Sequence, residues 1–382
     1  MTWHRLPTLG TLALAVTLVA GGCSSTRLDQ ARRTFYSGAP EQAAESLASA
    51  DVPKIDRVLL LMERGMMRRV AHDHRGAIDD WLNAASLAKE FDYLSVSRQS
   101  ASLAVNDAML AYRGPPYEQV LLHTFAATSF LALGLPDSAG VEARRTIRIL
   151  ENRGAYPDSA YARYVAGFCL EAAGDAQGSA VQYRIADKLH PTVTIDSATG
   201  ILQPAPPAEA IKPESAVNSG RELIVFVGIG RAPGAPAAWQ NQRWGRQPFA
   251  RIRQADLELG RTYSLSTVTE LLSRTEKVTS ARKAAKTATR IAIKESVSHA
   301  VRQQNESLGE LLRILLYALE TPDSRRWETL PQWLQVGRVS LPQTDAPVLI
   351  ECVGPDGVLA SQELRPMTVG NANRSIALLR FL

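Results

Sequence analysis

The stretch AYARYVAGFCLEAAGDAQGSAVQYRIADKLHPTV, residues 160–193, sets the architecture of the first half of the chain. It has the pattern of two helices joined by a short turn at Gly174. Small residues stand where the two helices should touch, and the aromatic Tyr183 stands between them. Pro191 ends the second helix, because proline cannot continue one. The pattern therefore predicts a tight helical hairpin.

The spacing within this stretch resembles a tetratricopeptide (TPR) unit, a helical hairpin of about 34 residues. The positions that match are Gly167, Gly174, Tyr183 and Ala186. Residues 58–91 repeat the pattern, with Gly65, Ala77, Trp81 and Ala84 at the corresponding places. Residues 120–153 repeat it more weakly, with Gly134 and Ala139.

Three stretches have small residues at the same positions of the unit. This agreement favours a TPR-like array over alanine-rich hairpins that match the pattern by chance. The spacing between the units is irregular, and a further predicted helix at about 92–113 fills the longest gap. Stacked hairpins of this kind present a concave face that binds peptides or other proteins.

Composition excludes several classes of protein. The 382 residues are 45% apolar and 21% charged, which is typical of folded chains of two or three domains. A formal net charge of +5 is too small to indicate nucleic-acid binding. Three cysteines without a C-x-x-C pair exclude a disulfide scaffold.

Residues 1–22 have the layout of a secretory signal peptide. A basic start at Arg5 precedes an apolar run over residues 9–20, and small residues lead into Cys23. The layout resembles a bacterial lipoprotein signal, which implies cleavage before Cys23 and a lipid (palmitate-type) anchor on its thiol. Ser24, rather than Asp, implies sorting to the outer membrane, on the periplasmic face. Plain secretion and a retained membrane helix are the alternatives.

Residues 191–220 are rich in Pro, Ala, Ser and Thr, a composition that favours extended chain over a packed core. They predict a linker between a TPR-like helical domain, residues 23–190, and a C-terminal domain, residues 221–382.

The C-terminal domain has the signals of an α+β fold. Apolar runs predict strands at 222–227, 333–341, 347–353, 358–364 and 375–381, with a hairpin turn at 354–357. Helical patterns cover 266–273, 276–304 and 307–320, and the Gly- and Pro-rich stretch 228–248 indicates a loop. The whole chain is predicted to be mainly α, with a smaller α+β part that contains a small β-sheet.

Three stretches of the chain resemble an uncharacterised family of bacterial outer-membrane lipoproteins with a TPR-like N-terminal half. They are PYEQVLLHTFAATSFLALGLPDSAGVEARR (116–145), ELIVFV followed by GRAP and ending at Pro233, and PDSRRWETLPQWLQVGRVSLP (322–342). The last stretch carries Trp327 and the Leu330-Pro331 pair before a strand. The resemblance implies a lipoprotein that faces the periplasm, with no assigned activity and a weak link to peptidoglycan synthesis.

The predicted helix 276–304 carries cations about every four residues, namely Arg282, Lys283, Lys286, Arg290 and Lys294. Like charges at this spacing lower the stability of a helix, so the stripe does not serve the helix itself. An anionic partner, such as lipid headgroups, wall polymer or an acidic protein surface, is one hypothesis. A solvated face that keeps the protein soluble is the other.

Motifs for cofactors and metals are weak. The glycines of 228–234 follow a strand, but they miss the dinucleotide spacing and no helix follows promptly. His72 and His74 lie two residues apart, where they would face different sides of a helix, and we interpret them as a solvated turn. Cys169 and Cys352 are expected to be buried thiols, with a disulfide as the alternative. No cofactor or metal is predicted.

These features together predict a non-enzymatic, lipid-anchored scaffold that binds proteins of the cell envelope through its helical groove, cell-wall assembly factors among them. The alternative is an enzyme or ligand-binding protein that acts on cell-wall or polysaccharide material through the C-terminal domain. A pocket in which titratable groups converge would favour that alternative.

Overall fold

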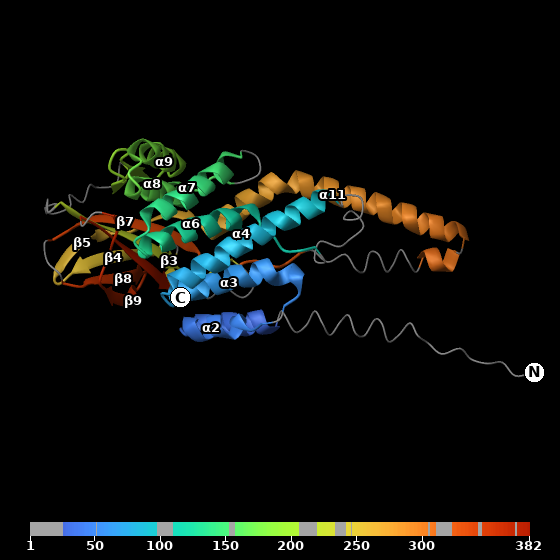
Figure 1. The fold of residues 1–382 in the computed structure, drawn as a ribbon, viewed down its shortest axis with the longest axis horizontal. Helices are drawn as coiled ribbons and strands as arrows, with labels where there is room; N and C mark the ends of the chain where they lie inside the picture. Colours follow the sequence, from blue (N-terminus) through green and yellow to red (C-terminus); the bar gives the residue numbers. More distant parts are fainter. Residues whose placement is uncertain are drawn as a thin grey trace, which may run out of the picture.

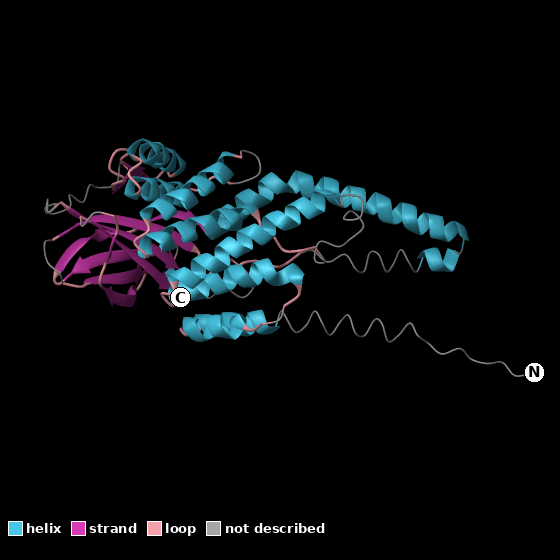
Figure 2. Ribbon diagram, viewed as in Figure 1, coloured by secondary structure: helices cyan, strands magenta, loops and turns pink. Residues whose placement is uncertain are grey.

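The computed structural model describes residues 26–382 apart from 51, 98–109, 153–156, 206–219, 234–241, 246, 305, 311–322, 343–345 and 371–372. An array of paired helices is followed by β-sheets, which confirms the predicted fold class (Figures 1 and 2). The predicted signal peptide and Cys23 lie outside the described residues. Within the described part, no helix is both long and apolar enough to cross a membrane.

The array begins with a helix over residues 26–36 and α2 (Pro40–Ala48), followed by the short η1 (Lys54–Asp56). Three helical hairpins follow: α3 (Arg57–Val70) with α4 (His74–Ser97), α6 (Pro116–Ala132) with α7 (Pro136–Glu151), and α8 (Ala160–Ala172) with α9 (Ala176–Leu189). The helix predicted at 92–113 is in part the end of α4, and residues 98–109 lie outside the described part.

Two hairpins close on a glycine that faces an aromatic ring. A Cβ atom on Gly65 would lie 2.4 Å from Trp81 Nε1, and one on Gly167 would lie 2.9 Å from the Tyr183 ring. Both distances are too short for any side chain, so only glycine allows this approach. The predicted small contact residues are fully buried, namely Ala77, Ala84, Ala139 and Ala186. Gly134 and Gly174 have positive φ angles of 69° and 86° just after α6 and α8, as C-terminal cap glycines do.

We expect Gly167→Leu to lower the free energy of unfolding by about 1–3 kcal/mol, because overpacking forces side chains off their preferred rotamers. Tyr183 cannot move aside cheaply, since its hydroxyl donates to Glu171 Oε2 at 2.5 Å. Urea denaturation would measure the change. Arg184→Leu, on the exposed face of α9, is the matched control and should change stability by less than about 0.5 kcal/mol. If Gly167→Leu and Arg184→Leu both changed stability by the same small amount, the Gly167–Tyr183 contact would not be what holds the hairpin together.

Two larger sheets contain the strands that follow residue 220. The first has the order β10-β11-β3-β7-β6 and consists of β10 (Met367–Thr368), β11 (Arg374–Phe381), β3 (Arg221–Ile229), β7 (Trp333–Leu341) and β6 (Tyr263–Thr267). Its β11 and β3 are parallel, and its other pairs are antiparallel. The second, antiparallel sheet has the order β5-β4-β8-β9 and consists of β5 (Leu257–Arg261), β4 (Phe249–Gln254), β8 (Val348–Gly354) and β9 (Gly357–Leu364).

Strand β3 shows how the layers stack. Its side chains alternate between two cores: Ile224 and Phe226 pack with the helices, whereas Val225 and Val227 pack with the second sheet. The first sheet is therefore the middle layer, with the helices on one face and the second sheet on the other (Figure 2). This explains why the sequence of β3 is apolar on both faces.

The β part is larger than predicted. Strands β4, β5 and β6 occupy residues 249–267, of which 266–267 were expected to begin a helix. Alternating Arg and apolar residues in FARIRQ are typical of a half-buried strand, and in β4 Ala250 and Ile252 face the core. The helices expected at 266–273 and 276–304 form one helix, α11 (Val268–Gln304), and residues 306–310 are also helical. Of the helix predicted at 307–320, residues 311–320 lie outside the described part.

The first part of the predicted linker is folded. β1 (Val193–Ile195) pairs with β2 (Leu202–Pro204), and Val193 and Leu202 join the core beside α9. Asp187 accepts a hydrogen bond from the Ile195 backbone N–H at 2.8 Å and so holds the hairpin to the helix. The expectation that residues 191–220 pack no core is therefore wrong for 193–204, because their few β-branched and aliphatic residues alternate inward.

Candidate functional site: the groove of the helical array

The first helices of the three hairpins, α3, α6 and α8, lie on the concave side of the array. Every residue of α3 from Val58 to Met67 is buried, and so is every residue of α8 from Ala160 to Leu170. An isolated array would expose one face of these helices. Here β11 packs on α6, and β6 and β7 pack on α8. The groove that was predicted to receive envelope proteins is therefore filled by the chain itself.

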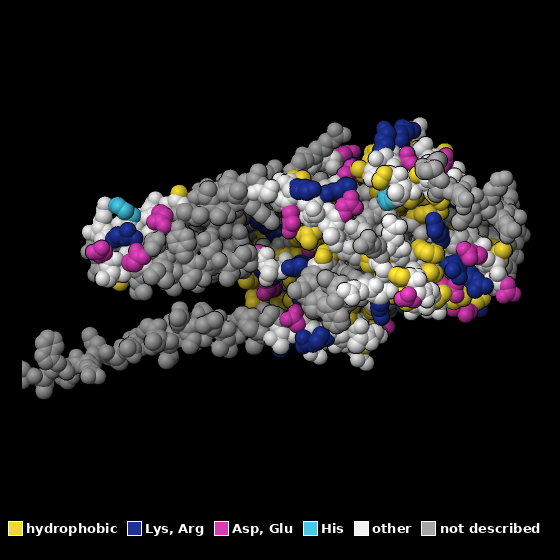
Figure 3. Space-filling model, turned by 180° about the vertical axis from the view of Figure 1, so that it is seen from behind, with side chains coloured by type: hydrophobic (Ala, Val, Ile, Leu, Met, Phe, Trp, Pro, Cys, Tyr) yellow, Lys and Arg dark blue, Asp and Glu magenta, His cyan; other side chains and the backbone are white. Residues whose placement is uncertain are grey.

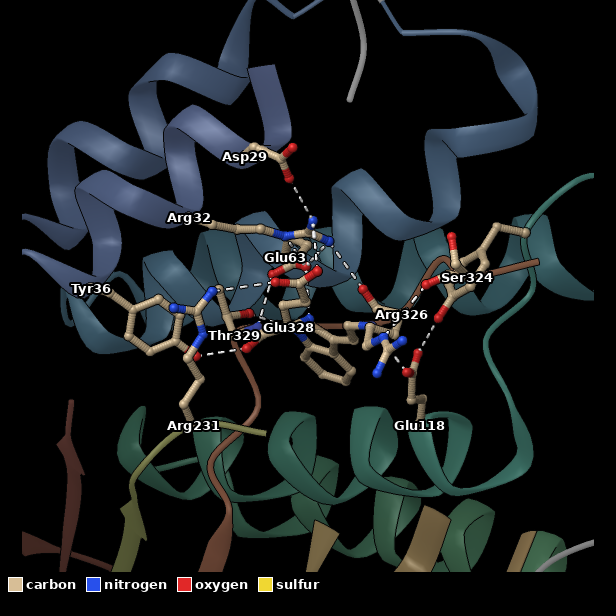
Figure 4. A network of polar contacts seen from close by, with 12 residues as sticks. Asp29, Arg32, Tyr36, Glu63, Glu118, Arg231, Ser324, Arg326, Glu328 and Thr329 are labelled. Atoms are coloured by element: carbon tan, nitrogen blue, oxygen red, sulfur yellow. Dashed lines mark hydrogen bonds and ion pairs between the residues drawn. The ribbon is translucent and has the colours of Figure 1, made fainter. Parts of the chain in front are cut away.

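An extended segment, residues 323–332, crosses the remaining part of the groove over α3 and α6 (Figure 4). Trp327 anchors it and is only 1% exposed. Its ring lies 6.2 Å from the Trp81 ring and 6.0 Å from the Phe125 ring, centroid to centroid. Its Nε1–H donates to Thr329 Oγ1 at 2.9 Å, so the indole nitrogen is satisfied within the segment.

Glu63 binds the backbone of the segment. Its carboxylate accepts hydrogen bonds from the N–H groups of Glu328 (2.9 Å) and Thr329 (3.1 Å). The same carboxylate pairs with Arg32 Nη2 at 2.6 Å. Glu63 is fully buried, so each of these partners offsets part of the cost of burying its charge.

Glu118, from α6, binds the preceding peptide group. It accepts hydrogen bonds from the Trp327 N–H (3.0 Å) and from the hydroxyls of Tyr112 (2.5 Å) and Tyr117 (3.0 Å). Burial raises the pKa of Glu118 to about 7, although these three donors oppose the shift. Two buried carboxylates thus hold three consecutive backbone N–H groups of an extended segment.

Arginines fasten both ends of the segment. Arg325 pairs with Asp56 at 2.8 Å and donates to the Leu110 carbonyl at 2.8 Å. Arg231, which lies over the Tyr36 ring, pairs with Glu328 at 3.3 Å. These contacts tie the segment to the helices at one end and to the chain after β3 at the other. Figure 4 shows Arg231 beside Tyr36 and Glu328.

The three stretches that carry the family resemblance meet at this site. Glu118 belongs to the first stretch, Arg231 and Pro233 to the second, and Trp327 to the third. Arg326 Nη1 donates to the Pro233 carbonyl at 3.1 Å. Glu63 was not predicted as a site residue; its signal in the sequence is a charge inside the apolar run VLLLMERGMM of α3.

The structure places the other predicted residues away from this groove. The cationic stripe lies on α11, but its side chains are outside the described part, so an anionic partner there stays a prediction. His72 is exposed at the turn between α3 and α4, whereas His74 is buried, and burial and the charge of Arg69 lower its pKa to about 4. The solvated-turn interpretation is therefore wrong for His74, whose ring turns inward at the start of α4.

Cysteines and metal ligands give no further site in the described residues. Cys169 and Cys352 are buried free thiols in different cores, as expected. Among the residues with described side chains, no group of three or more His, Cys, Asp or Glu is placed to hold a metal ion.

Comparison with known proteins gives a distant structural match. The chain resembles TPR-containing proteins. One is described as the crystal structure of MamA: the match covers 42% of this chain and 75% of that chain, with 17% identity and a TM-score of 0.30. Another is the Rap conjugation gene regulator in complex with a Phr peptide: the match covers 43% of this chain and 41% of that chain, with 13% identity and a TM-score of 0.29. The sequence matches no family model and no curated protein.

The raised pKa of Glu118 predicts pH-dependent stability. A carboxyl whose pKa rises on folding, here from 4.5 to about 7, favours the folded state when it is protonated. Its contribution is present below pH 4.5 and is lost as the pH rises through 7. We therefore expect the stability difference between the wild type and Glu118→Gln to change by about 3 kcal/mol between pH 4.5 and pH 8, in favour of the variant at pH 8.

Urea denaturation at several pH values would measure this difference, because the other titrating groups contribute equally to both proteins. Glu45→Gln, at an exposed position of α2, is the control and should show no pH-dependent difference from the wild type. A constant difference between wild type and Glu118→Gln across this range would contradict the prediction.

Proposed function

We propose that this protein is a non-enzymatic scaffold of the bacterial cell envelope, anchored by lipid at Cys23 to the periplasmic face of the outer membrane, and that it binds other envelope proteins. The observation that carries the protein-binding part is the array of hairpins closed by the Gly65–Trp81 and Gly167–Tyr183 contacts. Stacked hairpins of this type serve as interaction scaffolds. The anchor rests on the signal layout of residues 1–22.

The filled groove moves the proposed binding surface to the outside of the molecule. With residues 323–332 in place, the chain itself covers the inner helices α3 and α8 of the array. The second helices of the hairpins, α4, α7 and α9, keep an exposed face. On α7 and α9 this face includes Val141 (47% exposed) and Val181 (46% exposed).

Helix α11 adds a second outward surface. Its 37 residues touch the body near its start, at α6 and β6, and the helix then projects away as an arm (Figure 1). Near the end of the arm, Arg302 pairs with Glu310 of the returning helix at 2.8 Å. Side chains of both charge signs gather at the tip of the arm (Figure 3). A charged arm of this kind suits contacts with another protein outside the main body.

Site-specific photo-crosslinking in cells would test the proposal. A photoreactive amino acid is placed at Val181 on the array, at His299 on the arm, or at Trp327 in the groove as the buried control. Crosslinks to one envelope protein from Val181 or His299, but not from Trp327, support an outward-facing scaffold. A partner captured from Trp327 alone would instead show that the groove opens, and no protein crosslink at any position would refute the scaffold.

The anchor needs a separate experiment. Wild-type protein should incorporate radioactive palmitate and fractionate with the outer membrane, whereas Cys23→Ser should accumulate as unlabelled precursor. Wild-type protein without label would refute the lipid anchor. It would not affect the proposal of protein binding, which the crosslinking experiment tests separately.

A further inference from the structure

A cavity lies between the helical array and the middle sheet. Phe125 lines it, and so does Pro331 of the 323–332 segment. It encloses about 560 Å³ of space between its lining atoms, part of it open to solvent. Part of its wall is apolar and includes Met66, Phe125, Tyr161, Phe226 and Leu378.

Two arginines line this apolar cavity. Arg69 comes from the last turn of α3, and Arg380 comes from the end of β11. Within the described residues, neither guanidinium forms an ion pair with a carboxylate. Two like charges without a counter-ion in an apolar cavity are unfavourable, so their presence points to an anion that binds between them.

Arg69 has little to satisfy its charge. Its Nη2 donates to Thr128 Oγ1 at 3.2 Å, and its guanidinium lies 4.8 Å from the centre of the Phe125 ring. Burial lowers the pKa of Arg69, because partial burial disfavours the charged guanidinium.

The hydrogen-bond partners of Arg380 are backbone carbonyls and the Tyr36 hydroxyl, and none of them is a carboxylate. Its best hydrogen bond is to the Phe381 carbonyl at 2.8 Å, and its contacts with the carbonyls of Thr329, Leu330 and Gly228 are 3.4–3.5 Å long. Its Nε is buried without any hydrogen-bond partner. Burial and the neighbouring arginine charges lower its pKa to about 10, so it is still a cation at neutral pH.

The strand opposite makes room for this side chain. A Cβ atom on Gly228 would lie 3.2 Å from Arg380 Cδ and 2.9 Å from Pro331 Cβ, so a larger residue would push the arginine out of place. The cavity opens beside His72, which is exposed at the α3–α4 turn, and Gln362 of β9. A ligand could therefore enter without displacing the 323–332 segment.

We propose that this cavity binds an amphiphilic anion, with a carboxylate or phosphate headgroup between Arg69 and Arg380 and a short apolar chain against Met66, Phe125 and Phe226. The apolar walls exclude a purely polar ion as the preferred ligand, and the two cations exclude a neutral or cationic amphiphile. This binding site is independent of the scaffold surfaces proposed above.

Isothermal titration calorimetry on the purified full chain tests the proposal with four probes. Octanoate and octyl phosphate carry the two candidate headgroups, octylammonium carries the opposite charge, and acetate lacks the chain. We expect at least one of the two anionic amphiphiles to bind at least tenfold more tightly than octylammonium and acetate, and the tighter of the two identifies the headgroup. Absence of binding by both anionic amphiphiles, or equal binding of octylammonium, would overturn the proposal.

Variants locate the site. Arg69→Met and Arg380→Met should each weaken binding of the anionic amphiphile at least tenfold, whereas Arg184→Met, on the exposed face of α9, should leave it unchanged. Arg69→Met leaves no carboxylate unpaired, so it should keep the melting temperature of the unliganded protein and report binding even if Arg380→Met is unstable. Unchanged affinity in Arg69→Met would place the ligand elsewhere and refute this site.

Discussion

Glu63→Ala should lower the free energy of unfolding by about 4 kcal/mol, since breaking a buried ion pair typically costs roughly 3–5 kcal/mol. The substitution removes the nearest partner of Arg32, which is only 8% exposed. It also leaves the N–H groups of Glu328 and Thr329 without their acceptor. Urea denaturation followed by circular dichroism would measure the loss.

Two further variants separate these causes. Glu41→Ala, at an exposed position of α2, should change stability by less than about 0.5 kcal/mol. The double variant Arg32→Leu with Glu63→Leu removes both charges, so it should recover part of the loss but not all, because the two N–H groups still lack an acceptor. A Glu63→Ala protein as stable as the wild type would show that residues 323–332 are not held by this carboxylate.

Trp327→Ala should lower the free energy of unfolding by about 3–5 kcal/mol, the range typical of removing a large aromatic side chain from a core. The cavity would form between Trp81 and Phe125, which belong to two different hairpins. Segment 323–332 should then exchange its amide hydrogens faster, most clearly at residues 327–329. Hydrogen exchange with mass spectrometry would follow these amides.

Trp327→Phe is the matched control. It keeps an aromatic ring against Trp81 and Phe125 and loses the hydrogen bond to Thr329, so the expected cost is smaller than for Trp327→Ala. Because Trp327 and Glu63 hold the same segment, the double variant Glu63→Ala with Trp327→Ala should lose less stability than the sum of the single variants. Strict additivity would contradict a single segment held at two points.

Much of the helical array could be predicted from local patterns. A glycine placed opposite an aromatic residue across a turn allows two helices to approach closely, and Gly167 with Tyr183 does so within one hairpin. Strand β3 could also be predicted, because a short run of consecutive apolar residues is typical of a strand that is buried on both faces. Strands β4 to β6 were not predicted. Arginines alternate with apolar residues in β4, and these charges hid the strand pattern in the sequence.

The hairpins and the strands β3, β7, β8, β9 and β11 could be predicted from the sequence alone, because they depend on residues close together in the chain. The filling of the groove, in contrast, depends on contacts between residues far apart in the chain. Trp327 reaches Trp81 across 246 positions, and Glu63 accepts from a backbone 265 residues away. Every residue except proline has a backbone N–H, so the N–H groups that Glu63 and Glu118 bind leave no signal in the sequence. That Arg69 and Arg380 line one cavity is likewise evident only from the folded chain.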